Sequence, residues 1–189
     1  MRKNRFVIGI VLGIGLIIAV GRVEAKDKQF HANFVGAFTN KDDLSFTGTQ
    51  SFVGQSLLTG KSSLGDITVQ LVGENPLDGK TCTPPGGGSG VELGFAGELV
   101  VVSFPERGDQ LFLRLSPNIT SVGCFDLTTS VLTGQTTLDV TGGTGRFQGA
   151  TGTIVKTYHA KQLGPPPPSG KGAIGSFTGT FDGTIELAK

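Results

Sequence analysis

The sequence predicts an all-β protein in which many short strands are joined by tight turns. Of its 189 residues, 31 are Gly, which follow no three-residue period, and Thr and Val are abundant while Ala, Glu and Lys are scarce. Gly supplies the positive φ angles that turns need, and β-branched residues favour strands. Apolar residues make up 37% of the chain and charged residues 16%, which provides a core and argues against disorder. One domain is expected at this length.

Residues 1–25 have the pattern of a secretory signal peptide. A basic start at 2–5 precedes an apolar run at 6–20 and a small-x-small cleavage site at 23–25. The apolar run has 15 residues, three of them Gly, and is shorter than the roughly 20 residues that span a bilayer; an uncleaved anchor is the alternative. We therefore expect a secreted or periplasmic/extracellular protein whose mature chain, residues 26–189, is a single domain without stable membrane insertion.

Alternation of apolar and polar residues with period two marks strands that have one buried face. The clearest case lies near the C-terminus, where Phe177, Phe181 and Ile185 share one face with Gly179 and Gly183. No convincing amphipathic helix occurs, so the strands predict an antiparallel barrel or sandwich. The segments with strand character are 30–38, 44–54, 67–71, 91–104, 110–115, 125–131, 135–141, 151–160 and 176–187.

Cys82 and Cys124 are the only two cysteines, and both lie in the exported part of the chain. An even pair in an oxidising compartment predicts a disulfide, which would tie the TPPGGGSG loop at 83–90 to the strand that contains Phe125. Two buried thiols are the alternative if the chain is not exported.

Leu99–Phe104 and Gln110–Leu115 are expected to form a hairpin in which Phe104 pairs with Gln110. In this register Val100, Val102 and Phe112 lie together on the outer face of the sheet. An outward apolar patch on a soluble barrel is best explained by burial against another subunit, with a covering loop of the same chain as the alternative. These three residues are therefore the predicted oligomer interface.

Motifs for catalysis, cofactors and metals are missing from the sequence. The GGTG at 142–145 lacks the third Gly of a dinucleotide-binding loop, and no helix pattern follows it. No G-x-S-x-G or H-E-x-x-H occurs, and the two histidines, His31 and His159, are far apart. Without residues 1–25 the net charge changes from +1 to −2, and no basic stripe with interleaved aromatics is present. We predict no catalytic residue, cofactor, metal or nucleic-acid partner.

The segment 142–152, GGTGRFQGATG, lies between two predicted strands. Its glycines permit a tight reversal and close packing or a bulge, and its aromatic residue is expected to point inward. The positions concerned are Gly142, Gly143, Gly145, Phe147, Gly149 and Gly152. The segment resembles the G-G-[TS]-G-x-F-x-x-A-x-G element of the allene oxide cyclase and dirigent-like β-barrels. The resemblance implies an exported, eight-stranded antiparallel barrel and, as in plant members, a trimer. It carries over no catalytic residue, because residues 26–60 do not align with the catalytic segments of that family.

Three functions are compatible with these features. The first is a non-catalytic barrel that binds a small apolar molecule or a partner protein. The second is a cyclase- or dirigent-like protein that holds a reactive apolar substrate in one conformation. The third is a structural component of an envelope or matrix. A cavity above roughly 300 Å³ with inward polar groups would favour the second function, and a filled barrel would favour the third.

Overall fold

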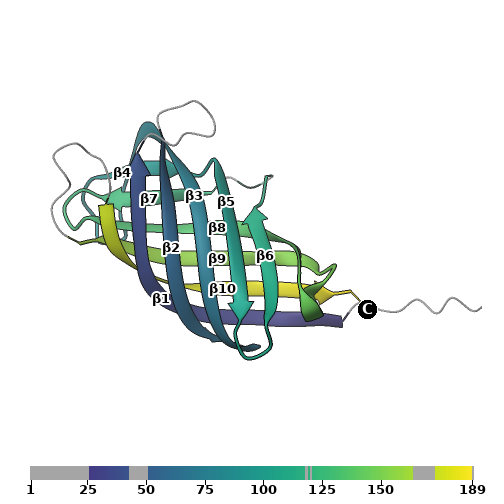
Figure 1. Ribbon diagram of the computed structural model, residues 1–189. Coiled ribbons are helices and arrows are strands. Elements are labelled where there is room, and N and C mark those ends of the chain that lie inside the picture. The colour runs from purple at the N-terminus through teal and green to yellow at the C-terminus, as the bar shows by residue number, and fades with distance from the viewer. Residues whose placement is uncertain (1–25, 43–50, 118, 120, 164–172, 189) are drawn as a thin grey trace, which may run out of the picture.

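The computed structural model describes residues 26–42, 51–117, 119, 121–163 and 173–188; the predicted signal peptide lies outside the described residues. The described chain is almost entirely β-strand, with one short 3-10 helix, η1, at Gly145–Phe147 (Figure 1). The strands are β1 Lys26–Asp42, β2 Ser51–Ser62, β3 Gly65–Cys82, β4 Gly90–Gly94, β5 Gly97–Phe104, β6 Asp109–Leu115, β7 Val122–Asp126, β8 Val131–Gly143, β9 Thr151–Gln162 and β10 Ala173–Leu187.

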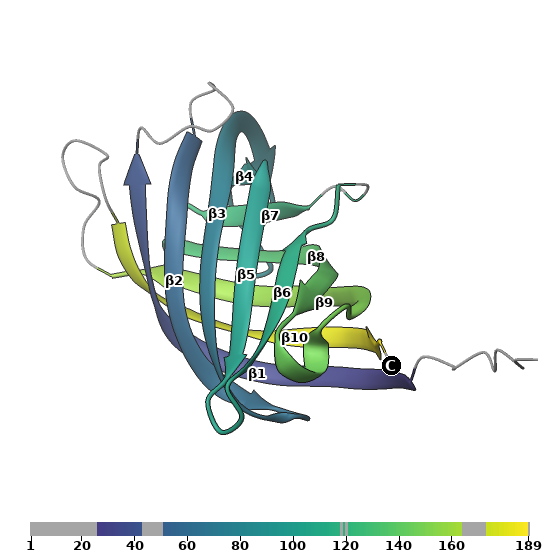
Figure 2. The ribbon, with the colours of Figure 1, turned by 45° about the vertical axis from the view of Figure 1, so that its right-hand side comes forward.

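Eight of these strands form a closed antiparallel barrel in the order β1, β2, β3, β5, β6, β8, β9 and β10, and β10 returns to β1. The long strands β3 and β8 each have two successive partners. Residues 68–74 of β3 pair with β5 and its last residues with β4, while β8 pairs first with β7 and then with β6. The wall between β3 and β8 therefore consists of the β5–β6 hairpin at one end of the barrel and the β4–β7 pair at the other (Figure 2).

The first and last strands of the barrel are joined by a ladder of Phe–Gly pairs. Along β1, Phe30, Phe34 and Phe38 lie opposite Gly183, Gly179 and Gly175 of β10. A Cβ atom at Gly175 would lie 2.1 Å from the Phe38 ring, and one at Gly179 would lie 2.7 Å from the Phe34 ring. Gly175 and Gly179 are therefore required so that the rings of Phe38 and Phe34 can lie across the neighbouring strand. Phe177 and Phe181 of β10 stack on the same rings and extend the core along this seam.

The predicted all-β barrel is confirmed, and so is the face of the last strand that carries Phe177, Phe181 and Ile185, all of which are buried. Two predicted strands are wrong. Residues 91–104 form two strands, β4 and β5, and residues 127–130 form a turn between β7 and β8. In the first case the break allows β3 to change partner. In the second, the Asp126 carboxylate accepts hydrogen bonds from the backbone N–H of Thr128 and Thr129, which stabilises the turn. Most of the predicted strand 44–54 lies outside the described residues.

The predicted register of the β5–β6 hairpin is wrong by one residue. Phe104 pairs with Asp109, because the turn closes with the N–H groups of Arg107 and Gly108 on the Phe104 carbonyl oxygen. The shift places Val100 and Val102 in the core, 1% and 0% exposed, whereas Leu99 is 66% exposed. Val100 and Val102 therefore cannot form the predicted oligomer interface, and of the three proposed residues only Phe112 stays on the outer face.

The predicted disulfide between Cys82 and Cys124 is confirmed, with Cα atoms 5.8 Å apart. It joins the end of β3 to β7 and thereby closes the part of the wall that β4 and β7 form. We expect the double variant Cys82→Ser/Cys124→Ser to lose about 2–4 kcal/mol of unfolding free energy in urea denaturation, since the link restricts the unfolded chain. A midpoint equal to that of the oxidised wild type would contradict this.

The segment 142–152 closes the end of the barrel opposite β4 and β7. Phe147 in η1 is 0% exposed, and its ring centroid lies 5.0 Å from that of Phe104. The Arg146 guanidinium lies 4.7 Å from both ring centroids and forms an ion pair with Asp109 at 3.2 Å. Positive φ angles occur at Gly142, Gly145, Gly149 and Gly152, and a Cβ atom at Gly143 would lie 2.0 Å from the Gln110 carbonyl oxygen. The predicted turn with an inward aromatic ring is confirmed.

Candidate functional site

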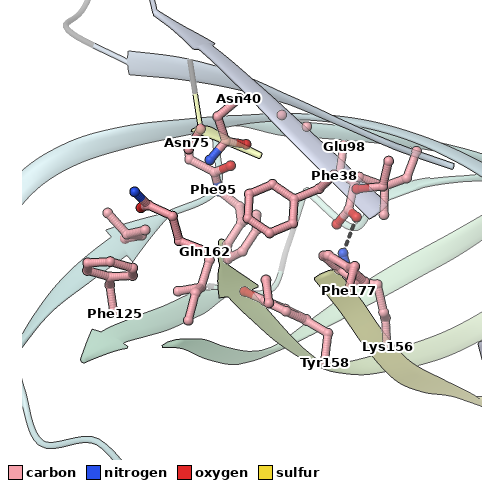
Figure 3. A pocket seen from close by; sticks show the side chains of 18 of the residues that line it. Phe38, Asn40, Asn75, Phe95, Glu98, Phe125, Lys156, Tyr158, Gln162 and Phe177 are labelled. Atoms are coloured by element: carbon pink, nitrogen blue, oxygen red, sulfur yellow. Dashed lines mark hydrogen bonds and ion pairs between the residues drawn. The ribbon is translucent and has the colours of Figure 1, made fainter. Parts of the chain in front are cut away.

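The half of the barrel framed by β4 and β7 is hollow. A cavity of about 340 Å³ lies inside it, between the ends of β1 and β9 and the middle of the barrel (Figure 3). Its walls are mainly aromatic and aliphatic side chains, which come from seven strands and the residues before β5. The apolar side chains of the lining are Phe38, Leu71, Val91, Leu93, Phe95, Phe125, Leu132, Ala160, Ala173 and Phe177.

Two charged side chains, Lys156 of β9 and Glu98 of β5, meet in the wall of this cavity. Lys156 Nζ forms an ion pair with Glu98 Oε1, and the two side chains are 2% and 1% exposed (Figure 3). The other carboxylate oxygen, Glu98 Oε2, is buried and accepts no hydrogen bond from any residue that the structure describes. Thr136, which lies opposite Lys156 on β8, also has a buried hydroxyl without a partner in the described chain. Unsatisfied hydrogen-bonding groups therefore lie beside the Lys156–Glu98 pair in an apolar setting.

Three aromatic rings surround the Lys156 ammonium. Its Nζ lies 4.8 Å from the ring centroid of Tyr158, 5.8 Å from that of Phe95 and 5.9 Å from that of Phe177. These ring faces attract the cation, and the Glu98 carboxylate balances its charge. Burial nevertheless lowers the pKa of Lys156 from its ordinary value, and the attraction of Glu98 acts in the opposite direction.

Tyr158 is the largest polar side chain of the cavity wall. Its ring stacks on the Phe177 ring, with the two centroids 5.4 Å apart. A Cβ atom at Gly123 or Gly134 would lie only 2.8 or 2.4 Å from the Tyr158 hydroxyl oxygen. The two glycines of β7 and β8 therefore provide the space for this hydroxyl. Burial, with a further contribution from Glu98, raises the pKa of Tyr158 far above its ordinary value, so the phenol stays neutral.

Amide side chains lie toward the end of the cavity where β1 and β9 end. Asn40, Asn75 and Gln162 line this part, and Asn75 Nδ2 donates a hydrogen bond to the Gly94 carbonyl oxygen at 3.2 Å. The cavity thus has a polar region near the strand ends, apolar walls, and the Lys156–Glu98 pair nearer the middle of the barrel (Figure 3). A molecule that is mostly apolar but carries a polar group fits this distribution.

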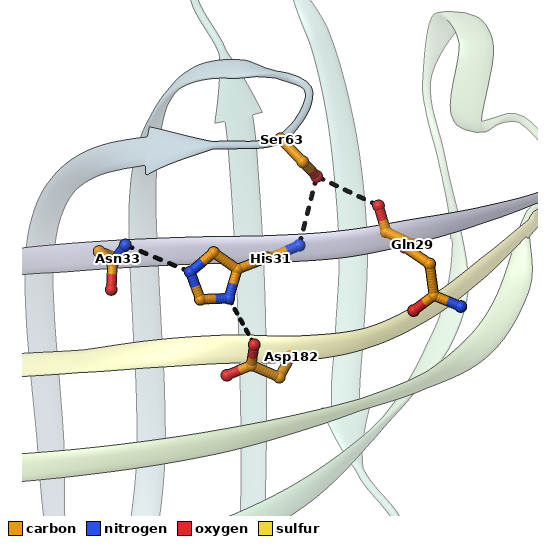
Figure 4. Close-up of polar contacts among 5 residues, drawn as sticks. All are labelled: Gln29, His31, Asn33, Ser63 and Asp182. Atoms are coloured by element: carbon orange, nitrogen blue, oxygen red, sulfur yellow. Dashed lines mark hydrogen bonds and ion pairs between the residues drawn. The ribbon is translucent and has the colours of Figure 1, made fainter.

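The two histidines do not contribute to this cavity, since both are exposed on the outer face. His31 Nδ1 pairs with Asp182 Oδ1, and the hydrogen bond from His31 lowers the pKa of Asp182 (Figure 4). Ser63 Oγ lies nearby, but it accepts a hydrogen bond from the His31 backbone N–H and donates one to the Gln29 carbonyl oxygen. The hydroxyl is therefore engaged with the backbone and not with the imidazole, so the three side chains do not form a nucleophile–base–acid arrangement.

Sequence reasoning missed Lys156, Glu98 and Tyr158, although their pattern contained a signal. Ile154, Tyr158 and Ala160 are buried, and Lys156 lies two residues from both Ile154 and Tyr158 on β9. The alternation that marks the inward face of the strand therefore includes the lysine. The equivalent signal for Glu98 depends on the register of β5, because it shares a face with Val100.

Comparison of the chain with protein-family models, curated proteins and solved structures finds no match. Within the ranges that the structure describes, no group of three or more His, Cys, Asp or Glu side chains is arranged to hold a metal ion. No helix in the described part of the chain is long and apolar enough to cross a membrane.

Proposed function

We propose that the barrel binds a small, mostly apolar molecule in the cavity between β4, β7 and β9. The observation that carries this proposal is the cavity itself, which has a volume of about 340 Å³ and mainly apolar walls. Volumes of roughly 300–1,000 Å³ are typical of small-molecule sites. Because Phe147 is buried at the opposite end of the barrel, we expect a ligand to enter near the amides Asn40, Asn75 and Gln162.

The hollow barrel argues against a purely structural role. A barrel of eight strands is often filled by its own side chains, and a structural component needs nothing else. Here small residues, among them Gly54, Gly73, Ala160 and Ala173, line the space where larger side chains would fill it. Retaining such a space in a small protein loses packing energy, which favours a binding function.

A second candidate is a protein that holds a reactive apolar substrate in one conformation. The inward polar groups Glu98, Lys156 and Tyr158 favour it, because they give the cavity fixed points that orient a ligand. It also agrees with the resemblance of residues 142–152 to allene oxide cyclase and dirigent-like barrels. Under both candidates we place the protein outside the cytoplasm, which the disulfide supports, and its assembly into a homo-oligomer such as a trimer stays a prediction.

The binding proposal is tested by narrowing the cavity at Gly73. A Cβ atom there would meet its neighbours only at 3.7–3.9 Å, so the backbone tolerates a side chain that projects into the cavity. With N-phenyl-1-naphthylamine, a neutral fluorescent apolar probe, we expect saturable fluorescence enhancement in the wild type and a loss of it in Gly73→Leu. The matched control is Val72→Leu on the outer face, which should bind as the wild type does. Equal binding by both variants would refute the cavity as the site.

A further inference from the structure

We propose that Lys156 binds an apolar aldehyde covalently, as an iminium whose counter-ion is Glu98. The inference rests on the proposed function, since the aldehyde must first enter the cavity. It names the ligand class more closely: a carbonyl compound of mainly hydrocarbon character that fits within about 340 Å³.

The position of the amine is the first argument. Lys156 is the only lysine among the buried residues of the described chain, and its side chain lines the cavity. Only one of its three N–H groups has a hydrogen-bond acceptor among the described residues, the Glu98 carboxylate. The other two lie among aromatic rings, so a ligand that enters the cavity meets an amine with no further acceptor to displace.

A structural role alone accounts poorly for this pair. Removing two charges from water is costly, and an apolar pair of similar volume commonly gives equal or greater stability. The walls around the pair are apolar, so such a replacement would fit its surroundings. The presence of an amine and a carboxylate in a cavity wall is therefore better explained by chemistry that needs both.

The reaction balances with the two side chains alone. The Lys156 ammonium transfers one proton to Glu98, and the free amine attacks the aldehyde carbon, so that an N–C bond forms and the C=O π bond breaks. A second proton moves from this nitrogen to the carbonyl oxygen, which becomes the hydroxyl of a neutral carbinolamine. Glu98 returns its proton to this hydroxyl, the C–O bond breaks, and water leaves. The product is an iminium beside the Glu98 carboxylate. The net charge is unchanged, and no oxidant or reductant is needed.

The surroundings favour both the attack and the product. Lysines desolvated in apolar pockets are the usual amine nucleophiles, and burial acts in this direction on Lys156. The iminium carries the same positive charge as the ammonium, so it keeps the ion pair and the attraction of the rings of Phe95, Tyr158 and Phe177. An aromatic or conjugated aldehyde would in addition stack on these rings.

The test uses cinnamaldehyde with sodium cyanoborohydride, which reduces an iminium to a stable secondary amine. Residue-level mass spectrometry of the oxidised protein should find the adduct on Lys156 in preference to the exposed Lys161 of the same strand. In Gly73→Leu, which replaces neither Lys156 nor Glu98, we expect labelling of Lys156 to fall by about tenfold, the effect of about 1.4 kcal/mol of lost binding. Labelling of Lys161 should be unchanged. Lys156→Arg keeps the charge and should remove the selective adduct.

The outcomes separate this inference from the proposed function. If N-phenyl-1-naphthylamine binds in the cavity but Lys156 is labelled no faster than Lys161, the imine is refuted and the binding function stands. The same holds if Gly73→Leu blocks the probe and leaves labelling of Lys156 intact. If the probe does not bind and Lys156 is not labelled, both are refuted. Selective labelling that cinnamyl alcohol, which has the same shape but no carbonyl group, suppresses by competition supports both.

Discussion

Replacing Phe147 with alanine is expected to lower the free energy of unfolding by about 3–5 kcal/mol, the usual loss for a fully buried aromatic ring. The ring is 0% exposed, packs on Phe104 and lies under the Arg146 guanidinium. Its removal leaves a void at the closed end of the barrel and also deprives Arg146 of one of its two ring contacts. Urea denaturation followed by circular dichroism measures the change.

Phe112→Ala is the matched control, because this ring lies on the outer face of β6 and is only partly buried. It should cost clearly less than Phe147→Ala. If the two substitutions had equal effects, Phe147 would not be the core residue that closes the barrel. Probe binding at the opposite end should persist in Phe147→Ala under conditions where the variant is folded. The reason is that none of the aromatic rings that line the cavity packs on the Phe147 ring.

Lys156→Met is expected to destabilise the protein by a similar amount, about 3–5 kcal/mol, because it leaves the Glu98 carboxylate buried without its partner. The double variant Lys156→Met/Glu98→Leu removes both charges and should recover most of the loss. Lys161→Met, an exposed position on the same strand, should change the free energy of unfolding by less than about 0.5 kcal/mol.

The double variant is the decisive measurement for this pair. Recovery of stability without recovery of aldehyde labelling is the expected combination, since the charges serve the site more than the fold. A double variant as unstable as Lys156→Met would instead mean that the ion pair itself stabilises the folded protein.

Features that depend on short stretches of sequence could be predicted. The inward face of β10 follows from the two-residue alternation of apolar and polar residues, and the turn at 142–152 follows from its glycines around one Phe. The Cys82–Cys124 link was predictable because only one pairing of two cysteines exists. In each case the local pattern has one physical solution.

The register of the β5–β6 hairpin, in contrast, could not be predicted from the sequence. Both faces of β5 and β6 carry Val, Leu or Phe, so shifting the pairing by one residue exchanges one apolar face for another. What decides the register is the turn, in which Phe104 accepts two backbone hydrogen bonds and pairs with Asp109. The error in register also concealed Glu98, whose side chain points inward only in the observed pairing.

Lys156 was overlooked for a different reason. A lysine in a strand normally lies on the solvent face, and its buried position is tolerable only because Glu98, 58 residues away in the sequence, reaches the same point inside the barrel. The cavity likewise depends on the small residues of several strands acting together. Neither property is contained in any one segment.

The pairing of β1 with β10 has a consequence for the order in which the molecule can form. The residues that meet there are separated by about 150 positions, as in His31 and Asp182. Of the described strands β10 is synthesised last, so there is a stage before it pairs in which the barrel is open. During that stage β1 and β9 have unpaired edges that can add strands from other chains. Folding of this topology is expected to be slow, on the scale of milliseconds to seconds, and dilution or a chaperone should raise its yield more than any change within the finished core.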